Sequence, residues 1–339
     1  MAMSFLAFRP TTMKKPALTL LLSLGLGACE TVIDLPEPPH TPRVALQFSL
    51  SNYAYTAQND NDELARTRKL FVSNSQRVFD LSELSGRSDA TVVILDEAGT
   101  VVEQFRALPP RSPGDVGYYE QTKQLKGEPG RTYTLRASLP GFETVESTLT
   151  MPKPAVIESA TFTKNAAQSN EYEVRGKLNV SIADDPGANN YYLAFARVVN
   201  EQNQQATTWS QVQVDEEDNE FGVEVGQFQL SNIGGLQGYG YGLYPYADTN
   251  VNGKRFSLNT GVRYYAGYCP QPTNCNRATY MEVFVTSLTA DTYNFYLSRQ
   301  RYNDTENNPF AEPAPLASNI KGGYGLFGGM MDAVYRIKL

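Results

Sequence analysis

The sequence predicts a mainly β protein with two tandem β-sandwich-like domains and one short α-helix in the second. Glycine, proline and tyrosine number 26, 20 and 21 in a chain of 339 residues, and charged residues make up only 19%. This composition is typical of an exported β-rich chain with many turns. Short segments of alternating apolar and polar residues, separated by turn-forming residues, favour sandwiches of the immunoglobulin-like or transthyretin-like kind.

Residues 1–28 read as a lipoprotein signal peptide. Lys14 and Lys15 form a basic region, an apolar run follows, and the letters LGAC end it at 26–29. A basic start, a short apolar stretch and small residues before the cut mark a secretory signal peptide. A transmembrane helix needs about 20 apolar residues, more than this run offers. Leucine three positions before cysteine is the bacterial lipobox, so we expect lipid on Cys29.

A tether over residues 29–43 should separate the lipid from the first domain. The letters DLPEPPHTP at 34–42 are rich in proline, which favours extended polyproline II. The first domain is expected over 44–150 and a linker over 151–155. The second domain is expected over 156–339.

Alternation and turn residues predict the strands of both domains. In the first domain Tyr133, just after a glycine turn, should pin a sandwich corner with its hydroxyl. The predicted strands are 44–50, 91–95, 100–105, 117–121, 131–138 and 144–150, then 172–182, 191–199, 222–230, 256–265, 280–286 and 333–339.

One helix is signalled in the second domain. Thr289 is a natural N-cap. Tyr293, Tyr296 and Leu297 then share one face at the i, i+3, i+4 spacing. That face is expected to cover one side or end of the second sheet. The glycine-rich run 322–329 lacks the lysine and following helix of a phosphate loop, so its glycines are expected to permit bulges or close backbone approach.

The net charge indicates which partners the protein can bind, and the cysteine content bears on the compartment in which it works. The net charge is -7, and loss of residues 1–28 removes Arg9, Lys14 and Lys15, giving -7 - 3 = -10. This argues against nucleic acid as a partner, because nucleic acid attracts basic surfaces. Outside the cytoplasm, Cys269 and Cys275 are expected to form a disulfide that closes a small loop.

Few residues in the sequence suggest a catalytic site. The single histidine, His40, lies in the tether, which sets aside Ser-His-Asp and zinc chemistry. The pair Asp184 and Asp185 and the acidic run 215–218 could serve a glycosidase, although each reads more simply as a polar loop. We therefore expect no enzymatic activity, with a carboxylate-based glycosidase as the remaining alternative.

A partial calcium motif is present. Asp248, Asn250, Asn252 and Gly253 match the first half of an EF-hand loop, but position twelve is Asn259 instead of glutamate. A hairpin turn at Asn252-Gly253 is the favoured interpretation, with a calcium site as the alternative. No cofactor is expected.

A group of tyrosines is the predicted partner-facing or ligand-facing surface. Tyrosines interleaved with glycine can form adaptable contact surfaces, although packing into the second sandwich is the competing explanation for any one of them. The group consists of Tyr239, Tyr241, Tyr244, Tyr246, Tyr264, Tyr265 and Tyr268.

The order of several motifs resembles one family: the outer-membrane lipoproteins of Bacteroidota-type bacteria catalogued as domain of unknown function 4249. The resemblance covers nearly the whole mature chain. It rests on the lipobox cysteine followed by VIDL at 32–35, GRTYTL at 130–135, DPG at 185–187 ahead of NYY at 190–192, the cysteine pair, NPF at 308–310, EP at 312–313, SNI at 318–320 and GGYGLFG at 322–328.

The resemblance implies a place at the outer membrane and a transport partner. Such lipoproteins are thought to accompany TonB-dependent transporters, and no catalytic residues are established for them. We therefore expect a lipid-anchored accessory or ligand-capturing subunit of such a β-barrel. The alternative is a stand-alone surface lipoprotein that binds glycan or peptide, and the side of the membrane it faces stays open.

Overall fold

The computed structural model describes residues 39–55, 62–77, 84–202, 211–215, 228–232, 242–271, 274–306 and 315–339. The side chains of Glu63, Pro113 and residues 268–275 and 304–306 lie outside this description. Residues His40 to Leu339 form one compact unit, separate from residues 1–39. The fold below is that of the compact unit.

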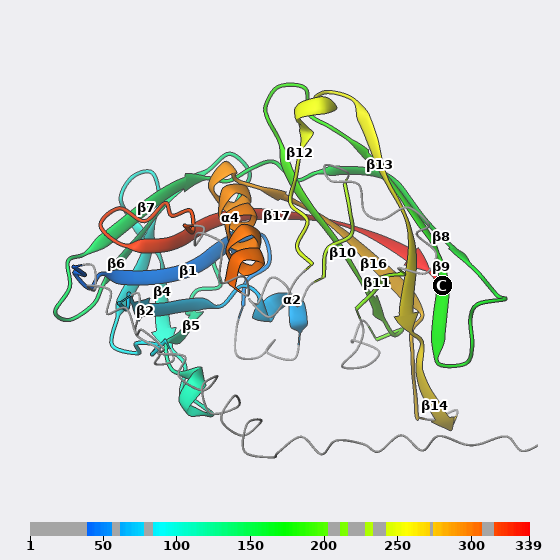
Figure 1. Ribbon diagram of the computed structural model, residues 1–339, viewed down its shortest axis with the longest axis horizontal. Helices are drawn as coiled ribbons and strands as arrows, with labels where there is room; N and C mark the ends of the chain where they lie inside the picture. Colours follow the sequence, from blue (N-terminus) through cyan, green and yellow to red (C-terminus); the bar gives the residue numbers. More distant parts are fainter. Residues whose placement is uncertain are drawn as a thin grey trace, which may run out of the picture. The chain divides into compact units, whose positions relative to one another are not determined.

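An eleven-stranded sheet runs in the order β12-β10-β16-β17-β1-β2-β5-β4-β3-β6-β7 (Figure 1). Most of its neighbours are antiparallel, which suits strands with one face on a core and one toward solvent. Its strands are β1 (Val44–Ser51), β2 (Leu70–Asn74), β3 (Thr91–Leu95), β4 (Val101–Ala107), β5 (Tyr118–Gln121), β6 (Thr132–Ser138), β7 (Val145–Thr150), β10 (Tyr191–Val199), β12 (Tyr246–Ala247), β16 (Tyr280–Leu288) and β17 (Tyr324–Lys338).

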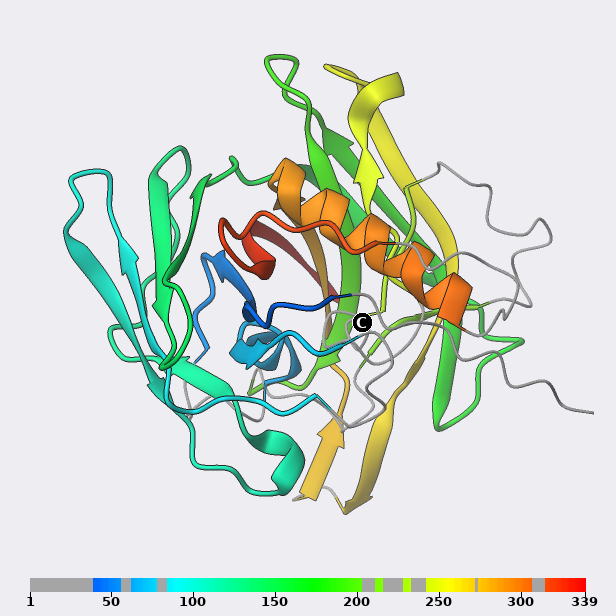
Figure 2. The same ribbon diagram turned by 60° about the vertical axis from the view of Figure 1, so that its left-hand side comes forward.

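A four-stranded sheet has the order β11-β13-β9-β8, and β14 pairs with β15 in a short ribbon. Helix α4 lies against β17 and β10 (Figure 2). The remaining elements are β8 (Val156–Lys164), β9 (Glu173–Ala183), β11 (Gln213–Val214), β13 (Arg255–Tyr265), β14 (Gly267–Gln271), β15 (Asn274–Arg277), α2 (Glu63–Arg66), α4 (Ala290–Glu306) and the 3-10 turns η2 (Pro113–Asp115) and η3 (Asp248–Asn250).

The last strand joins the two halves of the chain. The first part of β17 pairs parallel with β1, from Ala45↔Tyr324 to Ser51↔Met330. The second part pairs antiparallel with β16, from Leu288↔Met330 to Tyr280↔Lys338. One strand therefore belongs to both halves of the large sheet.

Three apolar cores surround this strand. The first lies among β1–β7 and takes Phe327 from β17. The second lies between the four-stranded sheet and β10, β16 and β17. The third covers the opposite face of β10 and β16 with residues of α2 and α4. Met151 belongs to the first core and Ala155 to the second, so the predicted linker passes between cores. The division into two domains stays a prediction.

The mainly β class and most of the predicted strands are confirmed. Tyr133 is buried in the first core, and the corner contact of its hydroxyl stays a prediction. The strand predicted at 333–339 is wrong in its start, because β17 begins at Tyr324 and includes most of the glycine-rich run. The predicted strand 222–230 lies mostly outside the described residues.

The predicted helix is confirmed as α4. Thr289 Oγ1 accepts a hydrogen bond from Thr292 N at 3.4 Å, as an N-cap does. The buried face is offset from the predicted one: Phe295 and Tyr296 are 5% and 3% exposed, and Thr292 is fully buried. The offset arises because Thr292 packs against the backbone of Gly329, where its Oγ1 accepts a hydrogen bond from the glycine N–H at 3.1 Å.

Close approach of β1 and β17 depends on a glycine. Gly325 has φ +108, and a Cβ there would lie 1.9 Å from the carbonyl oxygen of Leu46. We expect Gly325→Ala to lower the free energy of unfolding by at least about 3 kcal/mol, because the strands must separate or strain. The control is Gly99→Ala, where φ is +79 and nothing lies within 4 Å, so only about 1 kcal/mol is expected. Equal losses in urea denaturation would contradict this account.

Candidate functional site

Two turns far apart in the sequence meet at one end of the four-stranded sheet. One follows β9 and holds Asp184 and Asp185, and the other precedes β13 and holds Asp248, Asn250 and Asn252. The pairing of Arg255 with Ala183 brings the turns together. The structure therefore places the predicted carboxylate pair beside the predicted calcium residues.

A hydrogen-bond network joins the two turns. Asp184 Oδ1 accepts from the Tyr192 hydroxyl at 2.6 Å, and its Oδ2 accepts from Gly253 N at 2.7 Å. The Asn190 side-chain nitrogen donates to both Asp184 Oδ1 and Asp248 Oδ2, at 3.3 Å each. Asp184 and Asp248 are buried. Burial, followed by the bond to Asp184, raises the pKa of Tyr192 well above its usual range.

This network holds turns in place. The carboxylate oxygens accept from N–H and O–H donors, and Asp185 pairs with Lys153 Nζ at 2.8 Å on the surface. Asn252 donates its side-chain nitrogen to Ala188 O at 3.3 Å. Among the described residues, no group of three or more His, Cys, Asp or Glu side chains is arranged to hold a metal ion.

The hairpin predicted at Asn252-Gly253 is wrong. The strand before this turn, β12, pairs with β10 of the large sheet, and the strand after it, β13, pairs with β9. The turn therefore carries the chain from one sheet to the other. Asp184 accepts the Gly253 N–H in place of a facing hairpin strand.

The acidic run is described only at its first residue. Asp215 is 2% exposed and lies 3.4 Å from Arg175 Nη1. Residues 216–218 lie outside the described part of the chain. Asp215 is therefore an internal ion-pair partner instead of a solvated loop residue.

The tyrosine group does not gather on one surface. Tyr264 packs edge-on against Phe162 in the core, and burial raises its pKa to about 12. Tyr246 packs against Phe228 and Phe256. Tyr264 therefore faces the core instead of a partner. Tyr244 is half-buried, and Tyr239, Tyr241 and the Tyr268 side chain lie outside the described residues.

The side chains of Cys29, Cys269 and Cys275 lie outside the described part of the structure. Cys29 lies outside the described residues. Cys269 and Cys275 belong to the paired strands β14 and β15, but their side chains are outside the description. The disulfide stays a prediction.

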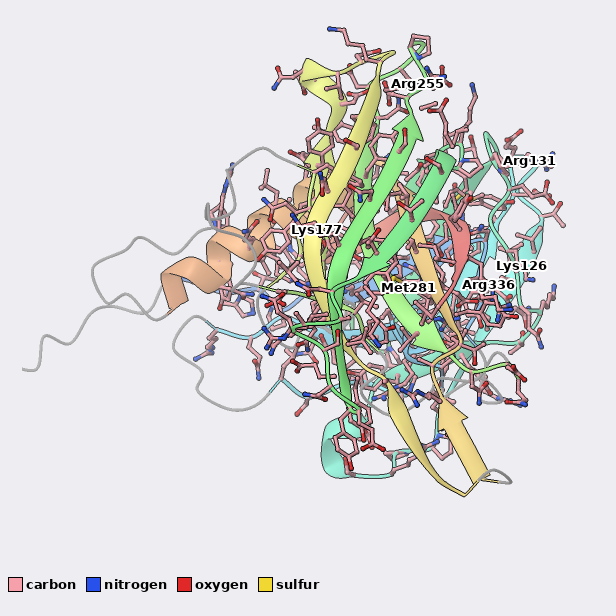
Figure 3. The ribbon with its side chains drawn as sticks, turned by 90° about the vertical axis from the view of Figure 1, so that its right-hand side faces the viewer. Lys126, Arg131, Lys177, Arg255, Met281 and Arg336 are labelled. Carbon is pink, nitrogen blue, oxygen red and sulfur yellow. The ribbon has the colours of Figure 1, made fainter. Side chains whose placement is uncertain are left out.

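One polar surface combines cations with exposed aromatic rings, on the outer face of the four-stranded sheet. We name it the cationic corner: Arg175 and Lys177 of β9, Arg263 and Tyr265 of β13, and Tyr172 just before β9. Figure 3 looks onto this sheet and labels Lys177. Arg263 lies directly opposite Arg175 in the strand register, which places two guanidinium groups side by side.

Carboxylates balance only part of this charge. Glu173 Oε1 lies 2.8 Å from Arg175 Nε, and its Oε2 lies 3.9 Å from Arg263 Nη1. The Arg263 side chain keeps 44% of its surface exposed. Lys177 is exposed and has no ion pair among the described residues. Like charges directly opposite destabilise a sheet, and the Glu173 carboxylate, which lies near both guanidinium groups, offsets part of that repulsion.

Sequence reasoning named Tyr265 of the cationic corner, as one of the predicted partner-facing tyrosines, but missed the cations. The alternation of Arg175 and Lys177 with Val174 and Leu178 predicts that both cations face solvent. Arg263 is 88 residues away (263 - 175), and nothing local to either segment indicates that β13 pairs with β9.

Comparison with known proteins assigns a family. The profile described as a domain of unknown function (DUF4249) matches residues 58–336. The chain belongs to the DUF4249 family. Among curated proteins there is no match. Within the described residues, no helix of this DUF4249 protein has the length and apolar character needed to cross a membrane.

Solved structures offer only distant likenesses. A crystal structure of a Salmonella alpha-2-macroglobulin mutant has 12% identity and a TM-score of 0.22, over 75% of this chain and 14% of that chain. The BSP domain of a biofilm associated protein has 7% identity and a TM-score of 0.13, over 88% of this chain and 62% of that one. TM-scores this low establish no shared fold for the DUF4249 chain.

Proposed function

We propose that this DUF4249 protein is a lipoprotein of the outer membrane that captures a ligand as an accessory subunit of a TonB-dependent transporter. The observation that carries the proposal is the lipobox at 26–29, placed ahead of a compact β unit that begins at His40. Two or more acyl chains anchor a protein far more firmly than one. Eleven residues (40 - 29) of extended tether would span about 34 Å, enough to let the β unit contact a neighbouring membrane protein.

A binding role without catalysis agrees with the side chains. Asp184 and Asp248, the buried carboxylates of the two joined turns, accept hydrogen bonds from groups that fix the turns. A glycosidase needs one carboxylic acid and one carboxylate facing the same bond. The cationic corner, in contrast, presents Arg263 and Lys177 to solvent and supports ligand capture.

Replacing the lipid-bearing cysteine tests the anchor and the partner together. We expect Cys29→Ser to move the protein from the membrane fraction to the soluble extract, because the acyl chains are lost. Affinity purification of the wild-type chain from detergent-solubilised membranes should recover a β-barrel transporter. Cys269→Ser is the matched control and should stay in the membrane. A Cys29→Ser protein still in the membrane, or a wild-type protein recovered without any β-barrel, would contradict the proposal.

The second candidate function is a stand-alone lipoprotein that binds glycan or peptide at the cell surface. The exposed Tyr172 ring, which stacks on Tyr265 two residues after Arg263, favours it. Protease treatment of intact cells distinguishes the two sides of the membrane, since a surface protein is cleaved without lysis. This candidate requires ligand binding by cells that lack the transporter.

A further inference from the structure

We propose that the cationic corner binds an acidic polysaccharide, with uronate carboxylates held by Arg263 and Lys177 and a sugar ring packed against Tyr172. The inference rests on the ligand capture proposed above and names the chemical class of that ligand. It concerns the outer face of the four-stranded sheet, where Tyr265 is the one residue that the cationic corner shares with the predicted tyrosine group.

Charge complementarity points to an anionic ligand. The mature chain carries a net charge of -10 (-7 - 3) and repels polyanions as a whole. The cationic corner sets the three cations Arg175, Lys177 and Arg263 against two carboxylates, those of Glu173 and the buried Asp215, which leaves one positive charge in excess among these side chains. A polyanion would therefore bind here in preference to the acidic remainder of the surface.

The side-chain hydrogen-bond donors of the cationic corner are suited to binding carboxylate groups. Arg175 is held by Glu173 and by Asp215, at 2.8 and 3.4 Å. Arg263, 3.9 Å from the nearest oxygen of Glu173, lies beyond hydrogen-bond distance of that group. Its planar fork of N–H donors suits bidentate contact with a carboxylate. Lys177 adds a second cation on the adjacent outward position of β9.

Two tyrosine rings supply an apolar platform at the end of the sheet, where Tyr265 is the next outward residue after Arg263 on β13. Tyr172 is 47% exposed, and its ring lies within 8° of parallel to that of Tyr265, with centroids 6.5 Å apart. Tyrosine offers a large rigid contact area at a low entropy cost, with a hydroxyl for hydrogen bonding. The apolar face of a sugar ring and its hydroxyl groups fit such a platform.

The rest of the face suits a polymer instead of a single small anion. Opposite Lys177 the register places Gly261, which is buried and whose carbonyl accepts a hydrogen bond from Asp215 N at 2.9 Å. Beyond it, short polar residues in paired register continue across the sheet toward Arg255, which Figure 3 labels on the same face. These residues are Thr161, Asn179, Asn259, Ser159, Ser181 and Ser257. Their hydroxyl and amide groups can bond to successive sugar units as far as Ser181, where the Glu158 carboxylate accepts from the serine hydroxyl at 3.4 Å and pairs with Arg255.

The test measures binding of two uronate polymers, polygalacturonate and alginate, to the full-length chain in detergent. Fully methyl-esterified polygalacturonate is the uncharged probe. We expect binding to the acidic polymers that weakens as salt rises, and no binding to the ester. Arg263→Ala combined with Lys177→Ala should weaken binding about a hundredfold, since each charged contact contributes about tenfold. Tyr172→Ala should weaken it about tenfold.

Lys126→Ala is the control, because it removes an exposed cation that lies outside the four-stranded sheet (Figure 3). It should bind as the wild type does, and circular dichroism should show every variant folded. Equal binding of the esterified polymer, an unchanged affinity in the double variant, or no binding of either acidic polymer would overturn the inference. So would binding to phosphatidylglycerol vesicles but not to polymer, which would indicate membrane docking. If a transporter co-purifies but no uronate polymer binds, only the ligand assignment fails.

Discussion

Glu103→Gln should lower the free energy of unfolding by about 4 kcal/mol, because it disrupts a fully buried carboxylate that organises a turn. Glu103 lies on β4 with no exposed surface. Its Oε1 accepts from the backbone N–H groups of Gln104, Thr122 and Lys123 at 2.8, 3.0 and 2.8 Å, and its Oε2 accepts from Leu125 N at 2.8 Å.

Glutamine keeps the shape of glutamate but replaces one acceptor oxygen with an NH2 group. That group would face backbone N–H donors, so at least one buried donor loses its partner and the remaining bonds lose their charge. The carboxylate also holds Gln124 at φ 56, a left-handed conformation that costs about 1–2 kcal/mol, because the N–H groups of both neighbours, Lys123 and Leu125, donate to Glu103.

Urea denaturation followed by circular dichroism measures the loss. The matched control is Glu97→Gln, because exposed Glu97 accepts a single backbone bond, from Thr132 N at 2.9 Å. About 0.5–1 kcal/mol is expected there. Similar losses in the two variants would show that the four-bond cluster contributes no more than one surface bond.

Asp332→Asn should destabilise the protein by a similar amount, about 3–5 kcal/mol, because it leaves a buried arginine charge uncompensated. Arg68 Nη2 lies 3.1 and 3.0 Å from Asp332 Oδ1 and Oδ2, and the two side chains are 1% and 4% exposed. Thr286 Oγ1 donates to Asp332 Oδ1 at 2.5 Å. The pair joins the segment before β2 to the last strand.

Replacing both partners by apolar residues should cost much less. Arg68→Met with Asp332→Leu removes both buried charges but leaves the buried Thr286 hydroxyl without its acceptor, so a loss of about 1–2 kcal/mol is expected. Asp89→Asn is the surface control, since the pair Arg87–Asp89 has side chains 29% and 48% exposed, and less than about 1 kcal/mol is expected. A double variant as unstable as Asp332→Asn would show that the pair specifies the packing itself.

Local patterns predicted much of the secondary structure, because strand alternation and helix capping act within a few residues. Thr289 caps α4 as predicted, and the segment at Val44 forms a strand. The short helix α2 was not predicted, since its region is polar in sequence. Its N-cap Asp62 accepts from Leu64 N at 2.9 Å and pairs with Arg197 Nη1 at 2.8 Å, a contact 135 residues away in sequence (197 - 62).

The candidate sites also depend on contacts between residues that are far apart in the sequence. The residues Asp184 and Asp248 were each identified from local motifs, but their meeting through Asn190 depends on the pairing of β9 with β13. The sequence analysis assigned Tyr264 and Tyr265 to one surface because both are tyrosines in a tyrosine-rich region. As neighbours on β13 they point to opposite faces of the sheet, and Tyr264 lies in the core.

By itself, the sequence determined the β class, the start of the helix and the acidic charge, because composition and short local patterns are sufficient for each of them. Only the tertiary structure decided that β17 pairs with β1, that Arg68 meets Asp332, and that Arg175 and Arg263 form a cationic corner. Alternation tells which side of a strand faces the core, but it does not name the neighbouring strand. Those neighbours are selected by packing and register across the whole sheet.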